Sequence, residues 1–145
     1  MATAKKAVKK PSFPLQPIVA AVAAAQPQAV PTRCSGPEIN IGIVSLHLGD
    51  PVNLHMVFCE SAFRLRIHLD GQVIFDQSGL QDQVDVLLPP LNAGFHSLTW
   101  SYLAASDPWH ARSEVQVSGL MRFALNKGSD STMPSNNLAV LLRVV

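Results

Sequence analysis

The sequence SDPWHARSE, residues 106 to 114, brings together side chains that could bind a partner or ligand. Trp109 and Arg112 are residue types enriched at interface hot spots, and His110 and Asp107 add hydrogen-bonding groups. In one interpretation an exposed Trp109 and these neighbours contact a partner. In the other, which we prefer, a proline-fixed turn folds Trp109 back over the open end of the core, with its indole N–H bonded to a backbone carbonyl.

A second group of candidate contacts lies near the start of the chain, in the sequence KKAVKKPSF. Lysines in this pattern could bind phosphates, but no aromatic residue lies among them and the rest of the chain is acidic. We therefore do not expect nucleic-acid binding. We expect this arm to contact a neighbouring protein or another copy of the chain, through Lys5, Lys6, Lys9, Lys10 and Phe13.

Catalytic and cofactor motifs with recognised spacing are missing from the sequence: it has no phosphate-binding glycine loop, no HExxH and no GxSxG. The five histidines fall on different expected elements and show no ligand spacing, so we expect structural histidines and no metal or cofactor. Asp82 and Asp85 could help bind calcium, but two carboxylates fall short of the six to eight oxygen ligands that calcium takes. We do not expect an enzyme.

The two cysteines, Cys34 and Cys59, form neither a CxxC pair nor a metal-ligand pattern. We expect two free thiols. The alternative is a single bridge between them, which would pin the arm to the body in an oxidising compartment.

The net charge of +1 conceals two regions of opposite charge. Residues 1–35 contain five basic and no acidic side chains, whereas residues 36–145 contain six basic and ten acidic ones. Residues 1–37 also hold six of the eleven prolines and nine alanines, a composition typical of an extended segment without its own core. We therefore expect a basic, proline-rich arm over residues 1–37 and one domain over residues 38–145.

The same arm has features of a secretion signal, with a basic start and an apolar run at residues 18–25. The run is short and alanine-rich, and three prolines precede it, so we favour an uncleaved arm over a signal peptide. No apolar run reaches the ~18 residues that a membrane-spanning helix needs.

From residue 39 onward the dominant hydrophobic period is two, which predicts strands. A strand at 39–48 is apolar on both faces, as in a central or doubly covered strand. One strand at 95–103 places Trp100 on its core face, and another at 114–125 contains Gly119, which suggests a bulge or a close crossing. About eight strands are expected, at residues 39–48, 52–58, 62–70, 72–76, 84–88, 95–103, 114–125 and 138–145.

Short strands joined by Gly, Pro, Asn and Asp turns indicate an all-β, antiparallel two-sheet β-sandwich, immunoglobulin-like or jelly-roll. A compact barrel is the alternative. For the turn after residue 68 we predict a three-residue loop with Gly71 at positive φ, because this register pairs Ile67 with Val73 and Leu65 with Phe75.

Two long polar connections, AASDPWHARSE and NKGSDSTMPSNN, are the expected binding rim, since loops gather at the ends of a sandwich. The leading hypothesis is a non-enzymatic structural or adaptor subunit of a larger assembly, such as a virion accessory or decoration protein, whose arm docks onto a neighbouring chain. One alternative is an exported carbohydrate-binding module that uses the Trp109 loop. A hydrolase with an unidentified site is the other.

Overall fold

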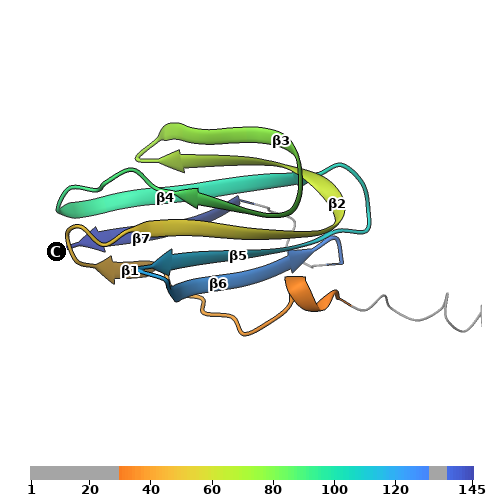
Figure 1. Ribbon diagram of the computed structural model, residues 1–145, viewed down its shortest axis with the longest axis horizontal. Coiled ribbons are helices and arrows are strands. Elements are labelled where there is room, and N and C mark those ends of the chain that lie inside the picture. The colour runs from red at the N-terminus through yellow and green to blue at the C-terminus, as the bar shows by residue number, and fades with distance from the viewer. Residues whose placement is uncertain (1–29, 131–136) are drawn as a thin grey trace, which may run out of the picture.

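The computed structural model describes residues 30–130 and 137–145, and these residues form an all-β structure with one short 3-10 helix (Figure 1). The elements in chain order are η2 (Thr32–Cys34), β1 (Ile43–Leu46), β2 (Val52–Leu69), β3 (Gln72–Leu87), β4 (Gly94–Ala104), β5 (His110–Val117), β6 (Leu120–Gly128) and β7 (Asn137–Val144).

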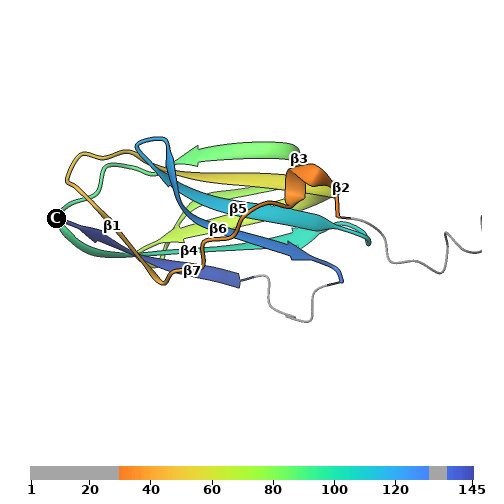
Figure 2. The same ribbon diagram turned by 90° about the horizontal axis from the view of Figure 1, so that it is seen from below.

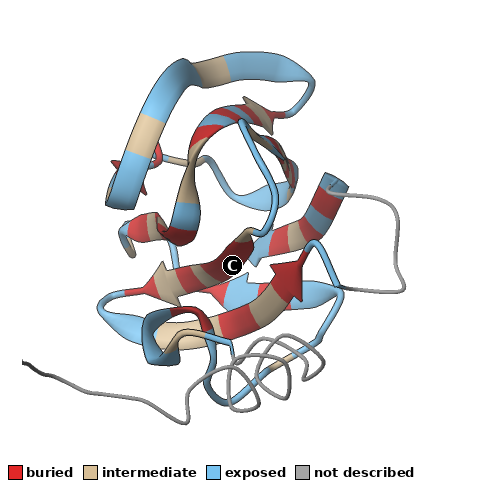
Figure 3. Ribbon diagram, turned by 90° about the vertical axis from the view of Figure 1, so that its right-hand side faces the viewer, coloured by how far each residue is buried: buried red, intermediate tan, exposed pale blue. Residues whose placement is uncertain are grey.

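Backbone hydrogen bonds join the seven strands into one sheet in the order β1-β7-β4-β2-β5-β6, with β3 also paired to β2. β1 runs parallel to β7, and the other neighbours are antiparallel. An isolated bridge between Ile39 and Ala124 of β6 brings the segment before β1 to the opposite edge. The sheet therefore curves almost closed around its core (Figure 3), and its hydrogen bonding does not divide into the two separate sheets that we expected.

The curvature depends on β2, a single strand of 18 residues where two strands were expected. Its first part, Val52–Cys59, pairs with β5, and its last part, Phe63–Leu69, pairs with β4. Between them Glu60 has a φ of 75° and the register with β3 shifts. Such an irregularity bends a strand, so one continuous strand takes part in both sets of pairings. The expected strands at 72–76 and 84–88 are joined in the same way within β3.

The turn between β2 and β3 corrects our predicted register. Leu69 pairs directly with Gln72, so the loop has two residues, Asp70 and Gly71, with φ values of 52° and 83°. Two successive positive φ angles are typical of a type I′ hairpin. The predicted positive φ of Gly71 is confirmed, but the three-residue loop is wrong.

A bulge beyond the turn explains why the apolar pattern was misleading. His68 pairs with Val73 and Ile67 pairs with Phe75, which leaves Ile74 without a partner residue. The extra residue shifts the alternation by one position, so Phe75 still packs against the core as predicted, opposite Ile67 rather than Leu65.

A second hairpin replaces the strand expected at residues 114–125. Val117 pairs with Leu120 across Ser118 and Gly119, whose φ values are 50° and 80°. Gly119 therefore occupies a turn between β5 and β6 and not a bulge within one strand.

The stretch at 39–48 is not a central strand. Its regular part, β1, pairs only with β7, so it lies at an edge of the sheet. Val44 and Leu46 are buried, but Ile43 on the other face is exposed. Apolar residues on both faces therefore do not indicate burial on both faces here.

The core lies inside the curved sheet, and Trp100 is its largest fully buried side chain, as predicted. Its indole N–H donates a hydrogen bond to Oγ of Ser113, 3.0 Å away, and its ring meets that of Phe123 edge to face. The buried polar atom therefore has a partner, as a buried indole requires.

Candidate interaction site at the base of the arm

Cys34 and Cys59 form a disulfide, which corrects the prediction of two free thiols. Cys34 is fully buried, and η2, which carries it, lies against β2 and β5 (Figure 2). Free thiols are the expected state of cysteines in a reducing compartment, but the fold brings these two side chains within bonding distance. The bridge fixes the base of the arm covalently to the corner of β2.

Arg112 holds the same segment from β5. Its side chain is buried, and its Nη2 donates a hydrogen bond to the carbonyl oxygen of Pro37, 2.9 Å away. Its Nη1 and Nε donate to Oδ1 of Asn126 and Oε2 of Glu114, each at 2.8 Å. Burial alone would raise the pKa of Glu114, but the hydrogen bonds from Arg112 and Gln116 outweigh burial, so this pKa lies below its usual range.

Asn126 on β6 adds hydrogen bonds to the next residues of the segment. Its backbone N–H donates to Oε2 of Glu38 at 2.8 Å, and its Nδ2 donates to the carbonyl oxygen of Gly36 at 3.1 Å. Two backbone hydrogen bonds, of 2.9 and 3.0 Å, then join Ile39 to Ala124. Residues 34–39 are therefore fastened to three strands by covalent, side-chain and backbone links; we call them the arm base.

The arm base explains why two predicted rim residues are buried. We placed His110 and Arg112 in a polar loop, but β5 begins at His110, and residues 110–113 are buried on both faces. One face of this part of β5 meets the core, and the arm base covers the other. The charged sequence HARSE concealed the strand because the covering residues lie about 75 positions away in the chain.

His110 lies between two carboxylates beside the disulfide. Its Nδ1 is paired with Oε1 of Glu60, and its Nε2 lies 3.3 Å from Oδ1 of Asp130 without hydrogen-bond geometry. The carbonyl oxygen of His110 is 3.5 Å from Sγ of Cys34. Its side chain thus helps to position the bend of β2 and the end of β6.

Trp109 folds back over the end of the core, as in the interpretation that we preferred. It is half-buried, and its ring meets those of Phe63 and Tyr102 edge to face, at centroid distances of 5.7 and 6.0 Å. Its backbone N–H donates to Oγ of Ser129, while no hydrogen bond from its indole N–H is seen within residues 30–130 and 137–145. The hydrogen bond that we expected from the indole N–H to a backbone carbonyl is therefore not present among the described residues. Asp107, two residues earlier in the chain, is exposed.

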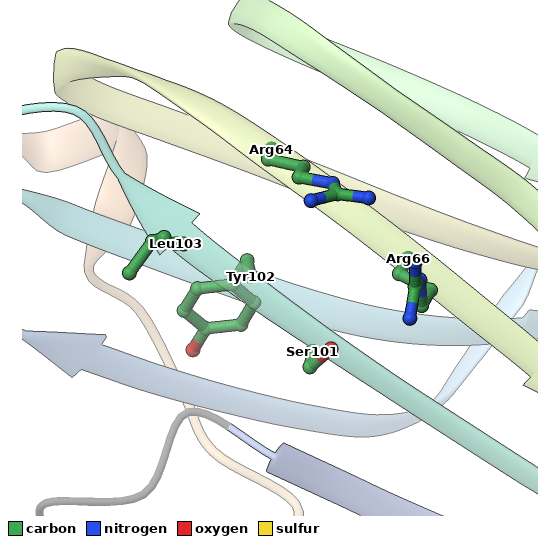
Figure 4. Close-up of a pocket in the computed structure, with 5 residues that line it drawn as sticks. All are labelled: Arg64, Arg66, Ser101, Tyr102 and Leu103. Carbon is green, nitrogen blue, oxygen red and sulfur yellow. The ribbon is translucent and has the colours of Figure 1, made fainter.

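A different group of charged residues lies on the outer face of β2, which the sequence marked only as the solvent side of a strand. Arg64 and Arg66 both donate hydrogen bonds to Asp76 of β3, at 2.9 to 3.1 Å. These bonds lower the pKa of Asp76 to about 2. The two guanidinium groups border an open hollow of about 340 Å³ above Ser101 and Leu103 of β4 (Figure 4).

Several predicted residues lie outside the described part of the chain. These are Lys5, Lys6, Lys9, Lys10 and Phe13 of the arm, together with residues 131–136 of the connection NKGSDSTMPSNN.

Among residues 30–130 and 137–145, no group of three or more His, Cys, Asp or Glu side chains is arranged to hold a metal ion. Asp82 pairs with Arg33 at 3.7 Å, and Asp85 accepts a hydrogen bond from Asn53 and lies 2.7 Å from Nδ1 of His55. No helix within this part of the chain is long and apolar enough to cross a membrane.

Comparison with known proteins found no matching family model, no matching curated protein and no matching solved structure.

Proposed function

We propose that this protein is a non-enzymatic structural or adaptor subunit of a larger assembly, such as a virion accessory or decoration component. In this role the basic, proline-rich arm docks onto a neighbouring chain while the β domain supplies a rigid body.

The observation that carries this proposal is the arm base. A buried disulfide, a buried arginine and a backbone bridge hold residues 34–39 on three strands. An arm that joins two chains transmits force and orientation only if its root is fixed, because a flexible root would leave the two bodies free to rotate. The root of this arm has that property, and the lysines that precede it carry charge opposite to that of the body.

We also propose that the curved sheet acts as the two layers of a sandwich, immunoglobulin-like or jelly-roll, with β2 and β3 crossing between them. The separate pairings of β2 with β5 and with β4 support this arrangement.

The test is native mass spectrometry of the untagged chain purified gently from its source, compared with a variant in which Lys5, Lys6, Lys9 and Lys10 are replaced by Glu. We expect the wild-type chain in complexes heavier than its 15.6 kDa monomer, and far fewer complexes for the variant. A monomer under all conditions, or complexes that the four substitutions leave unchanged, would contradict the proposal. Gln77→Glu/Gln83→Glu, at two exposed positions of β3, is the control for added negative charge on the body.

A second candidate function is binding of a carbohydrate that carries carboxylate or sulfate groups. The hollow beside Arg64 and Arg66 favours it, because Asp76 fixes both guanidinium groups while each keeps an Nη1 without a hydrogen bond to described residues. Arginine binds such anions through paired N–H groups. This location differs from the expected one at Trp109, whose ring is engaged by Phe63 and Tyr102.

Calorimetric titration with polyuronate and neutral glycans tests this second function. We expect binding of the polyuronate alone, lost in the double variant Arg64→Gln/Arg66→Gln and retained in Trp109→Phe. Equal binding by the double variant would exclude the hollow.

A further inference from the structure

The end of the domain opposite the arm base carries a concentration of exposed apolar side chains. Five large hydrophobic residues there are 54 to 69% exposed. We call this surface the apolar end, and its members are Leu48, Leu87, Phe95, Leu120 and Val145.

Backbone hydrogen bonds show that the segments of the apolar end lie side by side. The N–H of Leu48 donates to the carbonyl oxygen of Val145 at 2.8 Å, and that of Leu88 donates to Val52 at 2.9 Å. A further bond of 2.9 Å joins Ser118, in the turn before Leu120, to Pro51. Between these segments is a mainly apolar hollow of about 210 Å³, whose lining includes Pro51, Pro89, Pro90 and Leu91. This hollow has Leu87 in its lining, and the other four exposed apolar side chains lie at the same end of the domain, as at an interaction site.

The arm leaves the domain at the far end. β5 runs from His110, beside the disulfide, to Val117, and β6 returns from Leu120 to Gly128. Val30, the first described residue, lines a hollow with His110 and Gly128. Figure 1 shows the consequence: η2 lies at one end of the strands and the C-terminal residue at the other.

We propose that the apolar end is the docking site for the arm of a second copy of this chain, so that copies associate head to tail. This inference rests on the proposed function and names the neighbouring chain and the surface that it offers. The segment that docks is PSFPLQPIV, residues 11–19, whose three prolines favour a polyproline-like conformation on binding.

The chemistry of the two partners matches. Residues 11–19 hold three prolines and four large apolar residues, and a proline-rich segment is ordered on an apolar surface with little loss of conformational entropy. Four lysines precede this segment. The connections at the apolar end, residues 47–51, 70–71, 88–93 and 118–119, include Asp50 and Asp70 but no lysine or arginine. Arg122 and Arg143, however, lie close to Leu120 and Phe95, so the apolar surface of this end, rather than its charge, matches residues 11–19.

The placement of the two surfaces suits docking onto a neighbouring copy. Donor and acceptor surfaces lie at opposite ends of one molecule, which is the arrangement of a heterologous interface. Such an interface repeats from copy to copy and forms a ring or a filament, whereas two equivalent surfaces would form a closed dimer.

Photo-crosslinking of the full chain tests the inference. Phe13 is replaced by p-benzoylphenylalanine, and equal amounts of light and 15N-labelled protein are mixed before irradiation. We expect heavy–light crosslinks to residues 47–51, 87–91 and 118–120. Crosslinks confined to one copy would overturn the inference in favour of intramolecular docking.

Two further outcomes separate this inference from the proposed function. Heavy–light crosslinks to another surface would refute the apolar end while leaving arm docking intact. If no heavy–light crosslinks form and the mass stays that of a monomer at all concentrations, two hypotheses are refuted. These are docking of the arm at the apolar end and docking of the arm on any other part of a neighbouring copy.

A matched pair of variants supplies the specificity control. Leu87 at the apolar end and Leu103, at the opposite end of β4 from Phe95, are both 67% exposed. Leu87→Arg places a cation where the lysine arm docks, and we expect the yield of heavy–light crosslinks to fall at least about tenfold. We expect Leu103→Arg to leave it unchanged. If both variants fold normally, equal crosslink yields would exclude the apolar end as the docking site.

Discussion

Arg112 on β5 donates a hydrogen bond from Nη2 to the carbonyl oxygen of Pro37, 2.9 Å away and 75 residues earlier in the chain. The bond joins the middle of the domain to the root of its arm. Because the guanidinium group is buried and also serves Glu114 and Asn126, its loss would leave several polar groups without partners.

Replacing Arg112 by Met should therefore destabilise the protein by about 3 kcal/mol, because the partly buried carboxylate of Glu114 loses its counterion. Urea unfolding at neutral pH measures the change. Arg143→Met is the control, because Arg143 is exposed on β7, and it should change stability by less than about 0.5 kcal/mol. Similar losses for the two variants would contradict the role assigned to Arg112.

Removing the disulfide with Cys34→Ser/Cys59→Ser should lower the free energy of unfolding by about 3 kcal/mol, because the bridge closes a loop between residues 25 positions apart. Guanidinium unfolding with and without a reducing agent measures this. The reducing agent should shift the wild-type curve and leave that of the double variant in place. A wild-type curve insensitive to reduction would show that the bridge does not stabilise the fold.

Gly128→Ala should destabilise the protein by about 1 to 3 kcal/mol through overpacking. A Cβ at Gly128 would overlap Cδ2 of His110 and lie 2.6 Å from Oδ1 of Asp130. Gly42→Ala is the matched control, because nothing lies within 4 Å of its added Cβ. Thermal unfolding should show a clear loss for the first variant and no loss for the second, and the reverse order would refute the packing described at His110.

Stability should depend on pH through His96 and Asp70, whose Nδ1 and Oδ2 are 2.7 Å apart. The hydrogen bond with Asp70, aided by the carbonyl of Asn92, raises the pKa of His96 above its ordinary value of 6.5. The stabilisation is therefore present at about pH 6.5 and somewhat below, and it is lost as the pH rises through the folded-state pKa of His96. It is also lost in acid, where Asp70, whose pKa the hydrogen bond with His96 lowers, becomes protonated.

Asp70→Asn tests this linkage without disturbing the turn, because Asn accepts the positive φ that Asp70 adopts. The stability difference between wild type and variant should be larger at about pH 5.5 than at about pH 9, when His96 is neutral. NMR titration should show a lower pKa for His96 in the variant. A stability difference independent of pH would mean that the pair contributes no charge-dependent stabilisation.

The parts of the fold that could be predicted are those that local alternation determines. In β2 the apolar positions Leu65 and Ile67 are buried and Arg64 and Arg66 are exposed, and in β4 Trp100 lies in the core. A half-buried strand leaves this pattern directly in its sequence.

The connections between strands could not be predicted in the same way. Glu60 adopts a positive φ within β2 although no glycine marks the position, and Ile74 is an extra residue within β3. Both features depend on how distant strands pair, so no local pattern indicates them. They decide whether two apolar runs form two strands or one.

The arm base was missed for a related reason. Arg112 and His110 have polar side chains and were expected at the surface, but the segment that covers them is distant in sequence. The two cysteines were the available clue, since a bridge between them would have placed residue 34 beside β2.

The position of Cys59 also sets the path of mechanical load. Tension applied to the arm enters the body through the Cys34–Cys59 bond, next to the bend at Glu60, and divides between the half of β2 that pairs with β5 and the half that pairs with β4. The covalent bond bypasses residues 35–46, so tension on the arm does not have to pass through the four-residue edge strand β1. A pull that would peel a short strand from its neighbour is instead carried by the longest strand of the domain.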